Sequence, residues 1–112
     1  GRKPEKELIK PGGENVYPAE VEKVICDHPS VKQTVVFGVP DPKWKEGIKA
    51  VCVLTPDQAL TARELIDFVG GRIARYKKPQ YVQFVDSLPQ KNGAIDREAV
   101  KTLYGGDQRQ DQ

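Results

Sequence analysis

The chain has 112 residues, and its 18 basic and 16 acidic side chains leave a formal net charge of +2. A hydrophobic fraction of 38% over this length predicts one small globular domain and excludes two ordinary ones. The near balance of charge does not support nucleic-acid or membrane binding. No apolar stretch approaches the roughly 20 residues that span a bilayer, and the polar start has no signal-peptide pattern, so we expect a cytoplasmic protein.

Composition divides the chain into three predicted parts. Residues 1–6 are charged and interrupted by a proline, which predicts a linker or hinge remnant. Residues 7–105 carry the periodic apolar patterns and form the predicted domain. Residues 106–112 are polar and are expected to be a disordered tail.

The first predicted helix follows the glycine-containing loop 10–15. Pro18 suits its first turn, and Pro29 ends it. Apolar residues recur there at spacings of three and four, so one stripe is expected to face the core: Tyr17, Val21, Val24, Ile25 and His28.

Two β-branched segments predict strands at 31–39 and 50–55, joined by a connection at 40–44. The second segment is apolar without a break, which predicts a strand covered on both faces. A third strand is expected at 81–85. The N-terminal loop is expected to close a short hairpin.

Two more helices complete the predicted fold. Thr61 and Glu64 form a capping box for one, whose inward residues would be Leu65, Ile66, Val69 and Ile73. The other is expected at 96–104, ended by Gly105, with Ala99, Val100 and Leu103 facing inward. We therefore predict an α+β domain, a three-stranded central sheet flanked by helices.

The residues that most often carry chemistry are few in this chain. Cys26 and Cys52 have no metal-ligand or redox spacing, so both are expected to be small buried residues in a reducing compartment. His28, the single histidine, is expected to be a half-buried helix-end residue rather than a ligand or base.

Two segments have a composition suited to binding an anion. In the loop 10–15, Lys10 and the paired glycines would let backbone amides and an ammonium approach a phosphate or an extended ligand, and the alternative is a plain turn. A basic cluster around Tyr76 suits a phosphate or, equally, a solvated helix end. Its members are Arg72, Arg75, Lys77 and Lys78.

Five segments of the chain match one family pattern in order. They are residues 7–22, 38–41, 74–79, 88–89 and 93–97. Together they resemble the C-terminal domain of AMP-forming acyl-CoA synthetases, in the adenylate-forming superfamily, over nearly all of the chain.

That resemblance implies a two-step ligase. A carboxylate attacks ATP to give an acyl-adenylate and pyrophosphate, and the CoA thiol then displaces AMP. It implies that ATP, AMP and CoA are substrates of the full enzyme, that Mg²⁺ accompanies ATP, and that this domain alone binds none of them. The implied partner is the enzyme's own N-terminal adenylation domain, without which the isolated domain is expected to be inactive.

The resemblance also implies roles for individual residues. Gly1 and Arg2 fall at the hinge about which the small domain rotates between the two steps. Lys10 matches a lysine implicated in the second half-reaction. The loop has the composition of CoA ligases, and the residues that would line the CoA tunnel are Gly12, Gly13 and Glu14.

One position departs from the family pattern. Where the family presents a lysine for adenylation, an alignment anchored on Gly93 and Arg97 places Ala94. Lys91, three residues earlier, is the candidate substitute. An engineered change, a natural subgroup that uses another cation, and loss of adenylation would each explain the alanine, and the shortened loop before Gly93 favours the natural subgroup.

Two further hypotheses concern the chain as a whole. It could be a stand-alone regulatory or protein-interaction module that kept the fold and lost catalysis. Nucleic-acid binding through residues 72–78 is the least favoured hypothesis, because Tyr76 is the only aromatic residue available there for base stacking.

Overall fold

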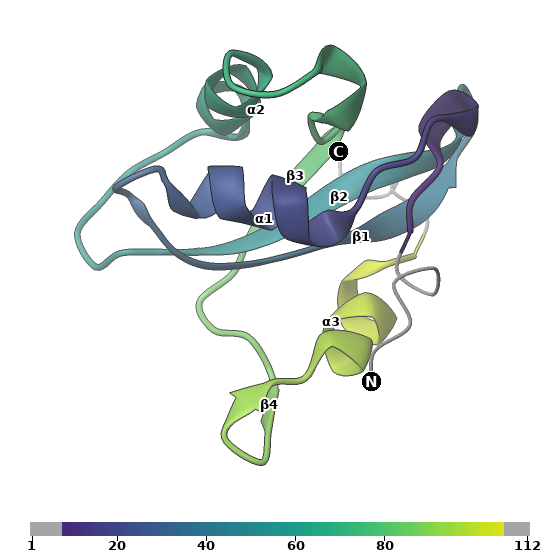
Figure 1. Cartoon of the computed structure of the whole chain (residues 1–112). Coiled ribbons are helices and arrows are strands. Elements are labelled where there is room, and N and C mark those ends of the chain that lie inside the picture. Colours follow the sequence, from purple (N-terminus) through teal and green to yellow (C-terminus); the bar gives the residue numbers. More distant parts are fainter. Residues whose placement is uncertain (1–7, 107–112) are drawn as a thin grey trace.

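The computed structural model describes residues 8–106, so the predicted hinge residues Gly1 and Arg2 and nearly all of the predicted tail lie outside the described part. A three-stranded sheet with the strand order β1-β2-β3 forms the centre, and helices cover both of its faces (Figure 1). The strands are β1 (Val31–Asp41), β2 (Lys45–Leu54) and β3 (Tyr81–Phe84). The predicted α+β class is confirmed.

Strands β1 and β2 form one long antiparallel hairpin. Its pairs run from Val31↔Leu54 to Asp41↔Lys45. The sequence predicted a connection at 40–44, which is wrong at its start, because Pro40 and Asp41 continue β1. A proline lacks the N–H of a ladder bond, but β1 is an edge strand, where that loss is tolerated.

Strand β2 is the buried centre of the sheet. It pairs antiparallel with β1 and parallel with β3, from Lys49↔Tyr81 to Cys52↔Phe84. Every residue from 47 to 53 is buried. The prediction of a strand covered on both faces is confirmed, and the reason is that helices lie on both sides of the sheet (Figure 1).

Helices α1 (Pro18–Cys26) and α2 (Ala62–Gly70) cover one face. Their fully buried residues join one core cluster with Ile48, Ala50 and Cys52, and they are Val21, Ile25, Leu65 and Val69. The predicted capping box is confirmed, since the Glu64 amide donates to the Thr61 hydroxyl at 3.1 Å and the Thr61 amide donates to the Glu64 carboxylate at 2.8 Å.

Helix α3 (Arg97–Tyr104) covers the opposite face. Val100 is fully buried there in a second core cluster with residues of β1 and β2. The expectation that Leu103 faces inward is wrong, because its side chain is 63% exposed. Val100 and Tyr104, four residues apart, define the narrow buried face, which leaves Leu103 on the outside.

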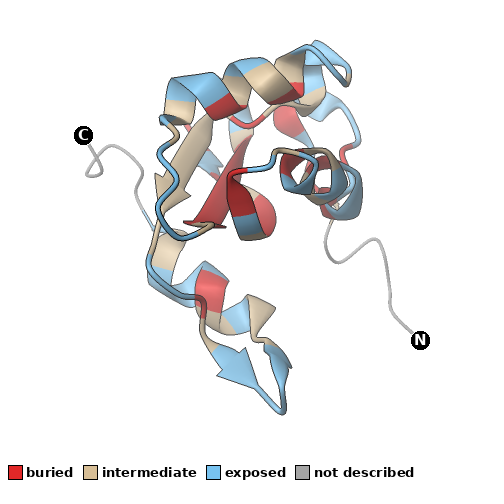
Figure 2. Ribbon diagram, turned by 90° about the vertical axis from the view of Figure 1, so that its left-hand side faces the viewer, coloured by how far each residue is buried: buried red, intermediate tan, exposed pale blue. Residues whose placement is uncertain are grey.

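A small hairpin, not predicted from the sequence, precedes α3. Strands β4 (Gln90–Lys91) and β5 (Ala94–Ile95) pair across the two-residue turn Asn92 and Gly93, whose φ angles are 55° and 81°. Figure 2 shows this hairpin as an exposed arm that extends from the packed body. The signal was present, because Asn-Gly with two positive φ angles is the preferred two-residue hairpin turn.

Two expectations for the first helix need correction. Tyr17 is 48% exposed, because it is the extended N-cap residue and does not share the helical period. Cys26 is exposed at the helix end, next to the buried Ile25. His28 is half-buried as expected, with its ring centroid 4.7 Å from that of Phe68 in an edge-to-face arrangement and with Nδ1 accepting a hydrogen bond from the Ser30 amide.

The two thiols are expected to react very differently. Burial raises the pKa of the Cys52 thiol to about 11, while burial and the carboxylates of Glu22 and Asp27 raise that of Cys26. Because the thiolate is the reactive form, we expect a thiol reagent at pH 7 to modify only Cys26 in the native chain, and slowly. Reaction should accelerate as the pH rises. Two fast-reacting thiols in native protein would contradict the structure.

Candidate functional site

The glycine loop lies in a short 3₁₀ turn, η2 (Pro11–Gly13). Gly12 and Gly13 have φ angles of 60° and 89°, which non-glycine residues rarely adopt. Their amides and that of Glu14 all donate to backbone carbonyls of the protein, those of Trp44, Lys10 and Pro11 respectively. In this structure these amides are therefore paired within the protein, and the loop presents exposed glycine backbone beside the exposed Lys10. Binding of a phosphate or an extended ligand by this loop stays a prediction.

The β1–β2 turn holds this loop in place. The Gly12 amide donates to the Trp44 carbonyl at 3.1 Å, and the Lys10 amide donates to the Glu46 carboxylate at 2.8 Å. The Glu46 side chain lies over Gly38, where a Cβ would collide with its carboxylate. Sequence reasoning missed Trp44 and Glu46, because no local pattern joins them to a loop more than thirty residues earlier.

Asp41 organises the turn that presents Trp44. Its carboxylate accepts the amides of Lys43 and Trp44 at 2.8 and 2.9 Å and the Tyr81 hydroxyl at 2.6 Å. Burial raises the pKa of the Asp41 carboxyl, but these hydrogen bonds outweigh it and hold the pKa below its usual range. The carboxylate therefore stays charged at neutral pH and fixes the turn to β3.

The two glycines of η2 make a matched pair for testing the loop. A Cβ at Gly12 would lie 3.0 Å from the Trp44 ring, whereas a Cβ at Gly13 would meet nothing within 4 Å. Both alanine variants share the cost of a positive φ, about 1–2 kcal/mol. We expect Gly12→Ala to lower the free energy of unfolding by more than Gly13→Ala, measured by urea denaturation, and Trp44→Ala to remove the difference. Equal losses in the two variants would contradict the contact.

The hairpin arm carries the other predicted site residues. Lys91 and Ala94 are both exposed and are direct cross-strand partners. Directly opposed residues of an antiparallel pair point to the same face, with Cβ atoms about 4.5–5.5 Å apart. Lys91 and Ala94 are three residues apart in the sequence but adjacent in space. Sequence analysis did not predict this, because it did not predict the hairpin.

Two members of the basic cluster, Arg72 and Lys77, are engaged within the domain. Lys77 forms an ion pair with Glu20 at 2.9 Å, and the hydrogen bond to that carboxylate raises the pKa of Lys77. The Arg72 guanidinium lies 3.6 Å from the centre of the Phe68 ring and donates to the Phe68 carbonyl. For Arg72, which donates to a carbonyl in the last turn of α2, the helix-end role suggested by the sequence is observed, whereas Lys77 is held by Glu20 of α1.

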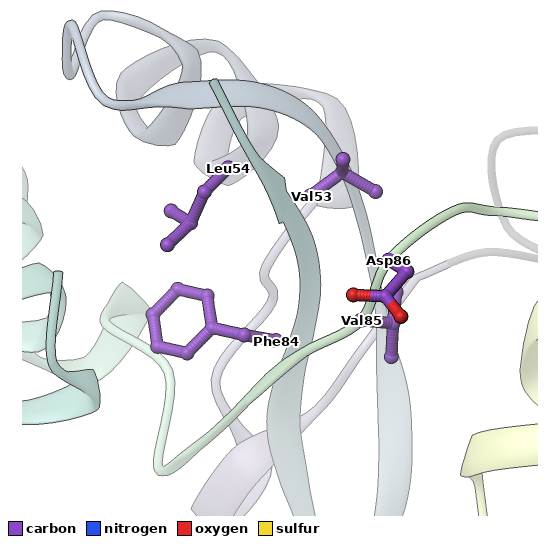
Figure 3. Close-up of a pocket in the computed structure, with 5 residues that line it drawn as sticks. All are labelled: Val53, Leu54, Phe84, Val85 and Asp86. Carbon is purple, nitrogen blue, oxygen red and sulfur yellow. The ribbon is translucent and has the colours of Figure 1, made fainter. Parts of the chain in front are cut away.

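The structure keeps the two candidate loops apart. In Figure 1 η2 and the β4–β5 hairpin lie at opposite ends of the molecule. A shallow hollow of about 200 Å³ lies at the end of β2 remote from η2, lined by Val53, Leu54, Phe84, Val85 and Asp86 (Figure 3). Asp86 is the only ionisable side chain among these five residues.

Two further features of the described residues concern membranes and metals. Within residues 8–106, no helix combines the length and the apolar character needed to cross a membrane. In the same residues, no three histidine, cysteine, aspartate or glutamate side chains come together as a metal site.

Known proteins contain a segment that is similar to this chain in both sequence and fold. The fatty acid–[acyl-carrier-protein] ligase ScoC of Streptomyces coeruleorubidus is 40% identical over 103 residues, 91% of this chain and 20% of that protein. Feruloyl-CoA synthase of Amycolatopsis sp is 42% identical over 101 residues, 89% of this chain and 21% of that protein. The solved Mycobacterium tuberculosis fatty acyl CoA synthetase has a TM-score of 0.82 at 38% identity, over 89% of this chain and 20% of that one.

A family model places the chain more directly. The chain spans about a fifth of the length of these relatives. Residues 20–93 match the model of the AMP-binding enzyme C-terminal domain, so the match covers the sheet and stops just before Ala94. Because more than half of its residues match, the chain belongs to the AMP-binding enzyme C-terminal domain family.

Proposed function

We propose that this chain is the mobile C-terminal domain of an acyl-CoA ligase that forms an acyl-adenylate from ATP and a carboxylate and then an acyl-CoA. The observation that carries the proposal is the separation of two exposed loops on one family scaffold, with Lys10 and the glycines at one end and the hairpin arm at the other. A domain that serves two successive reactions at one active site needs two such faces, one for each.

In the first half-reaction the hairpin arm faces the active site of the N-terminal domain. A carboxylate oxygen attacks the α-phosphorus of ATP, the bond to the β-phosphate oxygen breaks, and Mg²⁺-bound pyrophosphate leaves. An ammonium at the tip neutralises charge on the carboxylate and α-phosphate. Ala94 offers no charge, so Lys91, its cross-strand neighbour, is the residue of this chain that supplies it.

In the second half-reaction the domain has rotated about the hinge at Gly1 and Arg2, and η2 faces the active site. The CoA sulfur attacks the acyl carbonyl carbon, the bond to the phosphate oxygen breaks, and AMP leaves. The exposed backbone of Gly12 and Gly13, together with Glu14, lines the tunnel for the pantetheine arm. Lys10 takes part in this second half-reaction at the entrance of the tunnel. Glycines suit this role because a long, thin ligand can approach the backbone closely.

The two half-reactions can be measured separately on the full-length enzyme. We expect pyrophosphate release with ATP and a carboxylate in the absence of CoA, and CoA-dependent release of AMP from a synthetic acyl-adenylate. The isolated 112-residue chain should do neither. A full-length protein inactive in both assays across aliphatic and aromatic carboxylates would favour a regulatory or protein-interaction module that kept the fold and lost catalysis.

A further inference from the structure

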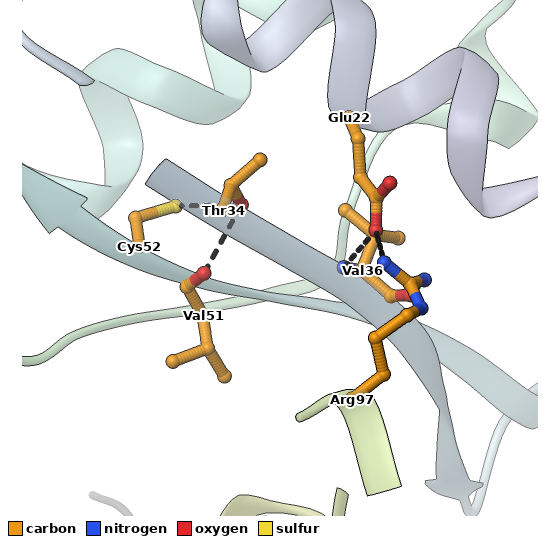
Figure 4. A network of polar contacts seen from close by, with 6 residues as sticks. All are labelled: Glu22, Thr34, Val36, Val51, Cys52 and Arg97. Atoms are coloured by element: carbon orange, nitrogen blue, oxygen red, sulfur yellow. Dashed lines mark hydrogen bonds and ion pairs between the residues drawn. The ribbon is translucent and has the colours of Figure 1, made fainter. Parts of the chain in front are cut away.

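At Val36, side chains satisfy the outward-facing backbone groups of the edge strand β1. At Val36 the backbone amide donates to the Glu22 carboxylate at 2.9 Å, and the backbone carbonyl accepts from the Arg97 guanidinium at 3.3 Å (Figure 4). Unpaired backbone groups on an edge strand need such partners. Glu22 comes from α1 and Arg97 from α3, so the edge of the sheet joins two helices that cover opposite faces.

The same two side chains also bind each other. The Arg97 guanidinium lies 2.8 Å from the Glu22 carboxylate oxygen that accepts the Val36 amide. Their side chains are only 35% and 19% exposed. A guanidinium presents several donors in a fixed plane, so one residue can hold the carboxylate and the carbonyl at the same time.

This network attaches the base of the hairpin arm to the sheet. Arg97 is the first residue of α3 and follows β5 by two positions. Between them, the Asp96 amide donates to the Pro89 carbonyl at 2.8 Å and closes the arm, while its carboxylate caps α3 through the Ala99 amide. The arm and the first turn of α3 are therefore one connected piece, and its direction depends on where Arg97 is fixed.

The far end of α3 is fixed independently. The buried Lys49 donates its ammonium to the Tyr104 carbonyl at 2.8 Å and to the Gln83 side chain at 2.7 Å. Because Val100 is buried between the two ends, we expect α3 to stay docked when Arg97 is replaced. Replacing Arg97 is therefore expected to change the orientation of the arm more than the stability of the fold.

We propose that Arg97 and Glu22 are positioning residues for adenylation, which orient the hairpin arm that carries Lys91 toward the α-phosphate. The proposal rests on the proposed function. Neither residue touches the reacting atoms. A displacement of about 1 Å in a catalytic group can cost on the order of a hundredfold in rate.

The test uses two conservative variants of the full-length enzyme. Arg97→Lys keeps the positive charge but loses the planar guanidinium and its several donors. Glu22→Gln keeps an acceptor for the Val36 amide but loses the negative charge. Each is expected to lower the kcat of pyrophosphate release about 10-fold to 100-fold. Thioester formation from a synthetic acyl-adenylate should change less than about 2-fold, because η2 does not depend on this network. The double variant should lose little more than either single one.

Glu20→Gln is the matched control. It breaks an ion pair of 2.9 Å from the same helix, the one to Lys77, which has no connection to the arm. Neither half-reaction should change in it. Hydrogen exchange at the Val36 amide should accelerate in the Arg97 and Glu22 variants only, because its acceptor loses its charge in Glu22→Gln and its fixed position in Arg97→Lys.

Two outcomes overturn the proposal. If both half-reactions fall together with the urea midpoint, the network is a general stability element. If neither half-reaction changes while Lys91→Ala impairs adenylation, the arm does not need Arg97 and Glu22 to orient it, and the proposed function still stands. Failure of the proposed function is recognised separately, by a wild-type enzyme that releases no pyrophosphate.

Discussion

Replacing Lys91 with alanine in the full-length enzyme is expected to slow acyl-adenylate formation by about a hundredfold to a thousandfold, the usual cost of removing one charge-stabilising contact. Lys91 is exposed at the tip of the arm, opposite Ala94, and its four-carbon stem can carry the ammonium across that position. Pyrophosphate release measured before the steady state reports this step. Thioester formation from a synthetic acyl-adenylate should remain at the wild-type rate.

Moving the charge across the hairpin provides the decisive comparison. Ala94→Lys in the Lys91→Ala background should restore adenylation, because the new ammonium starts from the same face of the same two strands. Lys101→Ala removes an exposed lysine from α3 and serves as the control for loss of surface charge. Adenylation at the wild-type rate in Lys91→Ala would exclude this lysine, and a failure of Ala94→Lys to rescue would show that the tip is not aligned as proposed.

Truncating Leu65 is expected to have the largest effect on stability. Its side chain is fully buried where α2 packs on the sheet. Leucine-to-alanine changes at such sites cost about 2–5 kcal/mol, from lost burial and from the cavity that remains. Urea denaturation followed by far-UV circular dichroism should show a lower midpoint with an unchanged slope.

Leu103→Ala is the matched control, because it removes the same atoms from a side chain that is 63% exposed. Its cost should stay within about 0.5 kcal/mol, as for other surface changes. The pair also tests the corrected orientation of α3. A loss in Leu103→Ala comparable to that in Leu65→Ala would mean that this leucine is covered after all.

The sequence predicted those elements whose causes are local. The capping box at Thr61 and Glu64, the proline at the start of α1 and the unbroken apolar run of β2 each act within a few residues, and each was confirmed. Asn92 and Gly93 carried an equally local signal for the hairpin. Recognising it would have placed Lys91 opposite Ala94.

The remaining features depend on residues distant in the chain. Periodicity could not decide how wide the buried face of α3 is, since that depends on which residues of β1 and β2 it meets. The glycine loop is held by hydrogen bonds to Trp44 and Glu46, and Glu22 forms an ion pair with Arg97. In each case the partners are more than thirty positions apart in the sequence. Such contacts follow from the fold and leave no pattern in a single sequence.

The two pairings of β2 differ in how soon a growing or refolding chain can make them. The antiparallel pairing with β1 needs only a tight turn, whereas the parallel pairing with β3 needs closure of the long connection that contains α2. Chains form local contacts sooner than distant ones. A fragment that ends before Tyr81 would therefore present β2 as an open, apolar edge, a known template for aggregation. Soluble expression of the domain should require the chain to extend through β3.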